Sequence, residues 1–367
     1  MAEALQPLID RIRDASAHGR ALRIRGGGTK DFLGESLQGE ILSTRDEPAL
    51  AGVVSYEPSE LVVTVRPGTP LAELEALLAA QGQCLPFEPP HCGPGATVGG
   101  MVASGLAGPA RASVGPVRDY VLGVQLVNGR GEHMVFGGQV MKNVAGYDVS
   151  RLMAGAFGTL GLMVEMSLKV LPVAPAEATL RFEMDQAQAL QRLNAWGGQP
   201  LPLNASCWVE EDGRGVLYLR LRGAVAAVQA ACRSLGGERV ADAQAGPDWA
   251  LCREQRLPWF EARGERELWR VSVPQVAPVL QLPETPLVEW HGGQRWVRVA
   301  PGEGDRVRAA AVAAGGHATL FRTAPGSGPA QTRFTPPTGP LLRIQQALQR
   351  QFDPAGIFNR GRLLQGA

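Results

Sequence analysis

The sequence contains one stretch, Gly93-Pro-Gly-Ala-Thr-Val-Gly-Gly-Met-Val-Ala-Ser-Gly-Leu-Ala-Gly-Pro-Ala-Arg-Ala-Ser-Val-Gly115, that holds seven glycines. A second glycine-rich turn, Arg25-Gly-Gly-Gly-Thr-Lys30, lies upstream of it. Glycine allows positive φ angles and leaves backbone N–H groups uncovered. Consecutive uncovered N–H groups form a concave site for an anion. Two such segments suit a diphosphate better than a single phosphate, so the pattern indicates a dinucleotide cofactor.

Composition offers an alternative explanation for these segments. The chain has 46 glycines in 367 residues, above the usual share of about 7%. Of its 36 basic residues only Lys30, Lys142 and Lys169 are lysines, which is typical of a coding bias. Some glycines therefore reflect this coding bias and have no structural role. Tight turns in a glycine-biased chain remain the alternative to a cofactor site.

Length and charge bound the class of protein. A chain of 367 residues predicts two domains at roughly 100–200 residues per domain. A net charge of +1 argues against nucleic acid or an anionic membrane as the main partner. No apolar run reaches the roughly 18 residues of a membrane span. Charged residues interrupt the N-terminus (Glu3, Asp10, Arg11), so we expect no signal peptide and a cytoplasmic protein.

The cysteines are few and widely spaced. They are Cys84, Cys92, Cys207, Cys232 and Cys252, and none forms Cys-x-x-Cys. This pattern is typical of reduced thiols in a cytosolic protein. It also excludes an iron–sulfur cluster of the ferredoxin type held by this chain alone, because such clusters need closely spaced cysteines.

Periodicity and turn signals predict the secondary structure. The clearest helix opens at Thr69-Pro70, where Thr69 suits the N-cap and Pro70 the first turn, and Gly82 ends it. The pair Asn128-Gly129 predicts a β-hairpin. The glycine stretch 93–115 is expected to be a long loop. Further helices are expected at 1–18, 185–194, 224–235 and from Leu341 to Phe352, and strands at 22–25, 40–43, 61–65, 120–127, 132–136, 158–171, 215–221, 268–273 and 296–299.

The character of the sequence changes after Pro175. Residues 176–322 contain all seven tryptophans and no glycine cluster of the earlier kind. They mix strand-like and helical patterns, which predicts a second α+β domain. A connector rich in proline and glycine follows at 323–340.

Several common cofactor and metal motifs are missing. Gly95-Ala-Thr-Val-Gly-Gly100 lacks the Gly-x-Gly-x-x-Gly spacing of the Rossmann fingerprint. No Gly-Lys dipeptide exists, which excludes a Walker loop. The five histidines form no His-x-His or His-Glu-x-x-His pattern, so no metal site is expected.

An ordered set of motifs remains. It comprises Arg25-Gly-Gly-Gly-Thr-Lys30, Thr64-Val-Arg-Pro-Gly68, Gly95-Ala-Thr-Val-Gly-Gly100 with Ser104-Gly105 and Gly108, Lys142-Asn-Val-Ala-Gly-Tyr-Asp148, and Gly158-Thr-Leu-Gly161. With these motifs the chain resembles the FAD-binding domain of the vanillyl-alcohol oxidase and p-cresol methylhydroxylase (PCMH) family, and within it the FAD-binding subunits of glycolate oxidases. The resemblance is dense over residues 1–172, returns in Asp353–Asn359, and is loose between them.

The resemblance implies an α+β fold with a two-subdomain PCMH-type FAD-binding domain at 1–174. A smaller α+β cap domain at 175–335 and a C-terminal segment at 336–367 that returns to the first domain would follow. The implied FAD-binding residues are Arg25, Gly26, Gly27, Gly28, Thr29, Lys30, Pro67, Gly68, Gly95, Ala96, Thr97, Val98, Gly99, Gly100, Ser104, Gly105, Gly108, Gly115, Lys142, Asn143, Gly146, Gly161, Val164 and Asn359. For Lys142 a capped turn with a structural role is the alternative.

The resemblance also implies FAD held without a covalent bond. Relatives that tether FAD often carry a histidine beside the first glycine turn, and here Thr29 and Lys30 fill that place. His91-Cys92 precedes the second glycine segment, and we expect a buried neutral pair there rather than a flavin link.

The sequence gives only weak indications of which residues are catalytic. Oxidation of a 2-hydroxy acid needs a group that holds the carboxylate and a base near neutral pH. In Glu289-Trp-His-Gly-Gly-Gln-Arg-Trp296 the candidates are His291 and Arg295, although an ordinary strand end explains them equally well. The sequence also contains a run of basic residues, which we interpret by default as a solvated face or a subunit contact. These residues are Arg253, Arg256, Arg263, Arg266 and Arg270.

Two departures from the family pattern concern catalysis. The related catalytic subunit carries Gly-Ser-Glu-Gly where this chain has Gly155-Ala-Phe-Gly158, so Phe157 replaces a carboxylate. Arg360 replaces the proline usual after the family's asparagine. Both weaken the case for a chain that oxidises substrate alone.

The resemblance thus implies an FAD-binding subunit of a multi-subunit glycolate oxidase or dehydrogenase, taking part in oxidation of glycolate to glyoxylate. Its partners would be the catalytic flavin subunit and an iron–sulfur subunit that receives the electrons, with membrane contact only through these partners. Two alternatives stay open: a self-sufficient FAD-dependent oxidoreductase for another 2-hydroxy acid, and a flavin-free scaffold subunit.

Overall fold

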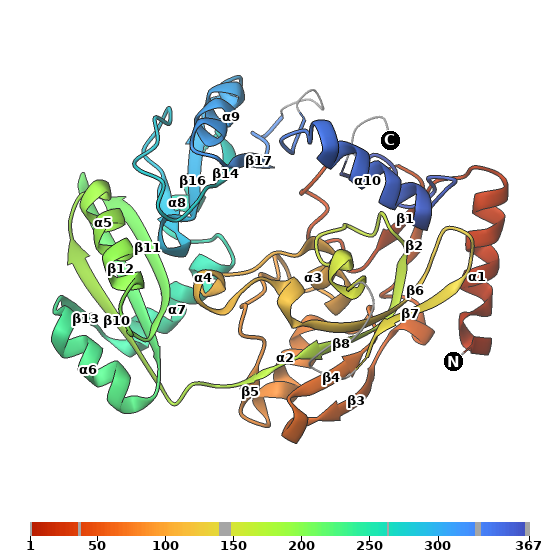
Figure 1. Ribbon diagram of the computed structural model, residues 1–367, viewed down its shortest axis with the longest axis horizontal. Coiled ribbons are helices and arrows are strands. Elements are labelled where there is room, and N and C mark those ends of the chain that lie inside the picture. The colour runs from red at the N-terminus through yellow and green to blue at the C-terminus, as the bar shows by residue number, and fades with distance from the viewer. Residues whose placement is uncertain (1, 36–37, 139–147, 263, 327–331, 364–367) are drawn as a thin grey trace.

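The computed structural model describes residues 2–35, 38–138, 148–262, 264–326 and 332–363. Within them the chain forms two large antiparallel sheets, one from residues 53–169 and one from 176–322. Figure 1 shows the first sheet on the right and the second on the left, with helices around both. The predicted α+β fold class is confirmed.

The first sheet has the strand order β3-β4-β8-β6-β7. Its strands are β3 (Val53–Glu57), β4 (Val62–Val65), β6 (Val121–Val127), β7 (His133–Gly137) and β8 (Leu162–Lys169). The helices α2 (Leu71–Ala79) and α3 (Val98–Ser104) place Leu71, Leu74 and Met101 in the same apolar core as this sheet. This packing fixes α3, and with it the glycine stretch, against the sheet.

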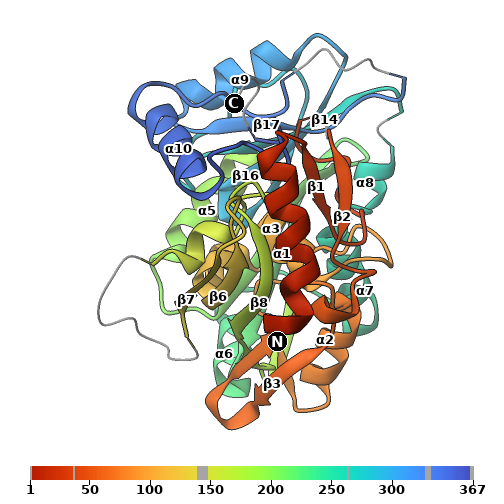
Figure 2. The same ribbon diagram turned by 90° about the vertical axis from the view of Figure 1, so that its right-hand side faces the viewer.

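A smaller parallel pair, β1 (Leu22–Arg25) and β2 (Glu40–Ser43), lies beside α1 (Ala2–Ala17). Figure 2 shows α1 in front, with β1 and β2 next to it. The C-terminal segment joins this pair, because the N–H of Leu22 donates to Ile357 O at 2.7 Å and that of Asn359 to Leu22 O at 2.9 Å. The two ends of the chain therefore build one layer together.

The second sheet has the strand order β13-β10-β12-β11-β15-β16-β14-β17. Its strands are β10 (Ala176–Glu183), β11 (Leu203–Glu211), β12 (Arg214–Gly223), β13 (Glu238–Val240), β14 (Glu267–Ser272), β15 (Leu287–Glu289), β16 (Gln294–Val299) and β17 (His317–Arg322). One face packs on α5 (Gln186–Gly197), α6 (Val225–Leu235) and α9 (Gly304–Ala313). The other face packs on α7 (Asp242–Arg253) and α8 (Pro258–Glu261), and also on Leu33 and Leu106 of the N-terminal half.

Several local predictions differ from the structure, among them the strand expected at 158–171, because β8 begins only at Leu162. The glycine stretch is not a loop throughout, because Thr97 caps α3 by accepting a hydrogen bond from Gly100 N at 3.2 Å. Pro70 rather than Thr69 occupies the cap position of α2, since the buried Thr69 hydroxyl bonds the backbone of Gly52 instead. The hairpin turn is longer than Asn128-Gly129, with β7 beginning only at His133. For Thr69 the contact with Gly52 outweighs the local preference for capping α2.

Candidate functional site

The two glycine-rich turns meet in space. A Cβ atom on Gly27 would overlap the backbone carbonyl of Gly95, and one on Gly26 would overlap the Thr97 hydroxyl. Only residues without a side chain allow this approach. The turns therefore form one continuous backbone surface, although they lie far apart in the sequence.

This surface encloses a cavity of about 90 Å³, which we call the glycine cradle. Its lining comes from β1, the turn after it, α3 and the C-terminal segment. The lining residues are Ile24, Arg25, Gly26, Gly27, Gly28, Thr29, Lys30, Asp31, Thr97, Gly100, Ala103, Ser104, Phe157, Asn359 and Arg362. The structure thus brings together ten of the residues that the sequence singled out: Arg25, Gly26, Gly27, Gly28, Thr29, Lys30, Thr97, Gly100, Ser104 and Asn359.

Five further predicted residues lie outside the described lining of the cradle but next to it in the sequence or through backbone hydrogen bonds: Pro67, Gly68, Ala96, Val98 and Gly99. The N–H of Gly99 donates to Pro67 O at 2.8 Å, and that of Val98 donates to Thr69 O at 2.9 Å. These bonds tie the second turn to the segment before α2, so they set the position of Thr97.

Charged side chains surround the cradle. Arg25 Nε donates to the Asp31 carboxylate at 2.8 Å. Lys30 Nζ reaches the carbonyl of His91 at 3.1 Å. Burial lowers the pKa of Lys30, although the nearby Cys92 and Glu254 act in the opposite direction. The cradle therefore combines backbone donors with cationic groups, which is the donor set that a phosphate anion prefers.

Asn359 closes the cradle from the C-terminal segment. Its Oδ1 accepts from Ile24 N at 2.8 Å and its Nδ2 donates to Phe157 O at 2.5 Å. Its φ of 40° lies in the left-handed region, which asparagine tolerates better than most residues. Arg362, which the sequence analysis missed, is buried beside it and donates to Lys30 O at 3.2 Å and Glu35 O at 3.0 Å.

A larger cleft of about 1150 Å³ adjoins the cradle, and Ser104 and Phe157 line both. The cleft lies between the two halves of the molecule. Its walls come from α3, α4 (Arg111–Val114) and the loop 154–157 on one side, and from β14, β17 and Trp290 on the other. Three arginines and one histidine line it: Arg111, Arg118, Arg270 and His317.

The remaining predicted residues lie around these two spaces. Gly105 lines the cleft with Ser104. Gly108 accepts a hydrogen bond from Trp290 Nε1 at 3.0 Å, and Gly115 ends α4. Gly161 and Val164 lie outside the described lining of both spaces; Val164 is buried in β8. Lys142, Asn143 and Gly146 lie outside the described residues.

The two catalytic candidates make contacts with protein groups. His291 bonds Ser206 Oγ at 3.0 Å through Nδ1 and Ser113 Oγ at 3.0 Å through Nε2. Burial lowers the pKa of His291 to about 4, so the ring is neutral at neutral pH. Arg295 is fully buried and donates to Pro278 O at 2.7 Å and to Ala277 O at 2.8 Å. Neither belongs to the described lining of the cleft.

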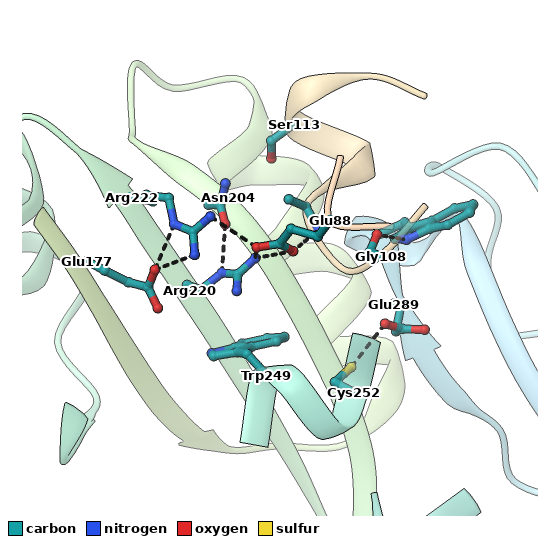
Figure 3. Close-up of polar contacts among 12 residues, drawn as sticks. Glu88, Gly108, Ser113, Glu177, Asn204, Arg220, Arg222, Trp249, Cys252 and Glu289 are labelled. Carbon is teal, nitrogen blue, oxygen red and sulfur yellow. Dashed lines mark hydrogen bonds and ion pairs between the residues drawn. The ribbon is translucent and has the colours of Figure 1, made fainter. Parts of the chain in front are cut away.

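An ion network joins the halves of the molecule next to α4. Figure 3 shows Glu88 facing Arg220 and Arg222 of β12. The distances are 2.7 Å to Arg220 Nη2 and 3.0 Å to Arg222 Nη1, and Glu88 also accepts from Ala110 N at 3.1 Å. Burial by itself raises the pKa of Glu88, but the two arginines outweigh it and hold the pKa below its usual value. The network fixes the wall from which Arg111 extends.

The cradle and cleft together fit FAD. The absence of Cβ atoms at Gly26 and Gly27 lets the two glycine-rich turns approach closely, and Arg25, Lys30 and Arg362 line the cavity that they share. Glycine-rich backbone and basic groups together suit a diphosphate. The cradle itself is too small for a whole dinucleotide, but Ser104 and Phe157 connect it with the large cleft. An elongated cofactor can therefore extend from one space into the other.

No described helix combines the length and apolar character that crossing a membrane requires. Among the same residues, no three histidines, cysteines or carboxylates gather closely enough to hold a metal ion.

Comparison with known proteins identifies the family. A model of the FAD binding domain matches residues 2–137. Glycolate oxidase subunit GlcE of Escherichia coli (strain K12) is 44% identical over 98% of this chain and 97% of its own length. Glycolate oxidase subunit GlcD of Bacillus subtilis (strain 168) is 31% identical over 35% of this chain and 27% of its own. A mitochondrial D-lactate dehydrogenase [cytochrome] of Arabidopsis thaliana is 31% identical over 39% of this chain and 25% of its own.

Solved structures agree on the fold. An alkyldihydroxyacetonephosphate synthase covers 96% of this chain, and this chain covers 73% of that one, with a TM-score of 0.64 and 15% identity. At this identity the likeness concerns the fold alone. The match to GlcE extends over both sheets and the C-terminal segment. The chain therefore belongs to the family of glycolate oxidase subunit GlcE and carries the FAD binding domain in its N-terminal part.

Proposed function

We propose that this chain is the FAD-binding subunit of a multi-subunit glycolate oxidase, which acts on the CH–OH group of glycolate and passes electrons to an iron–sulfur partner. One observation carries the proposal: a glycine cradle suited to a diphosphate opens into a large cleft lined by cationic side chains. The family relationship to GlcE supports the substrate class.

The proposal divides the chain into an FAD-binding domain at 1–174, a cap domain at 175–335 and a segment at 336–367. The first sheet ends at Lys169 and the second begins at Ala176, which supports a boundary between them. The bonds of Leu22 with Ile357 and Asn359 support the return of the last segment to the first domain.

In this proposal Gly26–Thr29 and Thr97–Gly100 hold the diphosphate of FAD, and Ser104, Gly105, Gly108, Gly115, Gly161, Val164 and Asn359 flank the remaining cofactor. Lys142, Asn143 and Gly146 complete the set. Bound there, FAD supplies the acceptor for a hydride from the substrate carbon. His291 and Arg295 position the wall of the cleft, because their ring and guanidinium groups are already bonded to protein atoms.

No covalent attachment is part of the proposal. Thr29 and Lys30 follow the first glycine turn. His91 lies near the second, but its Nε2 is paired with Glu75 at 2.9 Å. FAD would therefore be released when the protein is denatured.

A surface beside the cleft supports an electron-accepting partner. The helix α10 (Gly339–Phe352) places Leu341, Ile344, Leu348 and Phe352 on one stripe, as the sequence predicts, but only Phe352 is buried. Leu341 and Ile344 are 56% and 57% exposed, and Leu341 also lines the cleft. An amphipathic helix normally buries such a stripe. We assign it to the iron–sulfur subunit, because an electron acceptor must approach the cofactor cleft.

The proposal is tested on the protein purified with and without its partner subunits. We expect flavin absorbance in both preparations, and transfer of electrons from glycolate to quinone only when the partners are present. Turnover with quinone by the isolated chain would contradict the need for partners. A colourless chain that takes up no FAD would contradict the flavoprotein role and favour the scaffold alternative.

A self-sufficient oxidoreductase for another 2-hydroxy acid is the second candidate. It is favoured by one observation, namely that the arginine-lined cleft is built from this chain alone. A panel of 2-hydroxy acids assayed with the isolated, FAD-loaded chain and a soluble dye decides between the two. Turnover of another acid without partners would support this candidate, and inactivity across the panel would remove it.

A further inference from the structure

The cleft next to the cradle has an unusual charge pattern. Arg111, Arg118, Arg270 and His317 line it, whereas no aspartate or glutamate occurs among its described lining residues. Arg118 is exposed and lies 3.9 Å from Asp119, and burial lowers the pKa of His317, so these two groups need no further anion. Within the described residues Arg111 and Arg270 form no ion pair, and cationic side chains in a protein interior are normally paired, because an unpaired buried charge is costly. The pattern therefore indicates an anion as the normal occupant.

The sheet face explains how these groups reach the cleft. In the antiparallel pair β14–β17, Arg270 lies opposite Thr319 and Ser272 lies opposite His317. Directly opposed residues, and residues two apart on a strand, share one face of a sheet. All four line the cleft. The alternate residues of the same strands, among them Trp269 and Leu320, are buried in the core beneath α9.

Arg270 has a donor without a partner. Its Nε is buried, and no described residue accepts a hydrogen bond from it. Its guanidinium lies over the Phe321 ring at 5.9 Å, which holds it in place but satisfies no N–H group. Burial, and then the charge of Arg111, lower the pKa of Arg270 to about 10, so it stays cationic at neutral pH.

Arg111 approaches from the opposite wall. Its guanidinium stacks over the Trp290 ring at 4.4 Å, and Trp290 is fixed by its bond to Gly108 O at 3.0 Å. Burial, followed by the charge of Arg118, lowers the pKa of Arg111, whereas Asp119 opposes this shift. Two positive charges are thus held near each other on facing walls, and a shared anion relieves their repulsion.

We propose that Arg111 and Arg270 form a carboxylate site for a small 2-hydroxy acid, with Ser272, His317 and Thr319 on the same sheet face placed for its hydroxyl group. The planar guanidinium fork suits a carboxylate through paired N–H···O bonds. In the proposed function the anionic diphosphate of FAD occupies the cradle, whose described lining contains neither Arg111 nor Arg270. The identity of the acid rests on the proposed function, whereas the anion site rests on the cleft alone.

Titration of the FAD-loaded chain with oxalate tests the site. Oxalate is a small dicarboxylate without an oxidisable C–H bond, and its binding is followed by tryptophan fluorescence and by the flavin spectrum. We expect saturable binding in the wild type, and binding weaker by about tenfold to a hundredfold in Arg270→Gln and in Arg111→Gln. Arg270→Lys should recover part of the loss. Arg306→Gln, an exposed change on α9, is the matched control and should leave binding unchanged.

The outcomes are distinguishable. Unchanged oxalate binding in both variants, with FAD content and melting temperature preserved, would overturn the site. Loss of FAD from Arg270→Gln, with the melting temperature of the apoprotein unchanged, would assign the arginine to the cofactor and also overturn it. A wild type that binds oxalate through both arginines but supports no glycolate oxidation with its partners would support the anion site and refute the proposed function. Glycolamide, which lacks the carboxylate, should bind neither wild type nor variants.

Discussion

Gly27 is the residue at which the two turns of the cradle leave no room for a side chain. In Gly27→Ala the new Cβ would overlap the carbonyl of Gly95, so the two backbones must separate. Overpacking of this kind costs about 1–3 kcal/mol, and here it also displaces the diphosphate site. We expect loss of most bound FAD, measured as flavin absorbance per chain.

Gly197→Ala is the matched control for Gly27→Ala. It places a Cβ at the end of α5, where no atom lies within 4 Å. Alanine is favoured over glycine in a helix by roughly 0.5–1 kcal/mol, so this variant should keep its FAD and its stability. Full FAD content in Gly27→Ala would show that the cradle does not hold the cofactor.

His291 predicts an acid sensitivity of the fold. Burial lowers its pKa from 6.5 to about 4 in the folded state. The folded protein therefore takes up this proton less readily than the unfolded chain, and stability is lost as the pH falls below the unfolded value. The shift corresponds to about 3 kcal/mol between neutral pH and pH 4.

Urea unfolding at a series of pH values measures this effect. Below pH 6.5 the stability of the wild type should fall more steeply than that of His291→Gln, which keeps a hydrogen-bonding side chain but does not titrate. If the curves of stability against pH are parallel for the wild type and His291→Gln, burial does not lower the pKa of His291.

At the scale of elements, Glu88 connects α4 to β12. Glu88→Gln leaves the side chain of Arg220, which is only 3% exposed, without its anion. Removing one partner of a buried ion pair costs about 3–5 kcal/mol. We expect a lower free energy of unfolding and, because α4 carries Arg111, weaker oxalate binding in the cleft.

The pKa of Glu88 is depressed in the folded state. Its stabilisation is therefore present above the unfolded pKa of about 4.3 and lost as the pH falls through the lower folded value. Glu177→Gln, at the half-exposed partner of Arg222, is the control and should cost much less. Equal losses in the two variants would assign the effect to general surface charge.

The sequence predicts where helices and strands lie better than it predicts which of their side chains share one face of a sheet or line a cavity. The α2 helix and the strands of the β6–β7 hairpin follow from local signals, and the family and FAD follow from the order of the glycine motifs. Helix α3 was missed because glycine disfavours helices in isolation, whereas its packing on Pro67 sustains it here.

Arg270 shows that local sequence patterns do not predict the direction in which a side chain points. It belongs to a basic run whose default interpretation is a solvated face, and the structure places it in the cleft. Its direction is set by the pairing of β14 with β17, two strands that are distant in the sequence. Arg362 was missed for a similar reason, since only the return of the C-terminal segment brings it to Lys30.

At the scale of the whole molecule, the apolar stripe of α10 predicts an assembly surface. Changing Leu341 and Ile344 to glutamine removes two side chains that are more than half exposed, so the chain alone should keep its stability and FAD. We expect loss of copurification with the iron–sulfur subunit. Arg343→Gln, on the same helix but outside the stripe, is the control.

Retained copurification of the double variant would mean that the stripe does not face this partner. Lost copurification together with lost FAD would place the defect in the chain itself. The melting temperature of the isolated variant separates these two results.

The closure of the cradle by Asn359 has a consequence for biosynthesis. Asn359 bonds Ile24 and Phe157, which precede it by 335 and 202 residues. The ribosome adds Asn359 long after the glycine turns have emerged from its exit tunnel. A nascent chain therefore carries an open cradle until the segment that holds Asn359 has also emerged and reached Ile24 and Phe157.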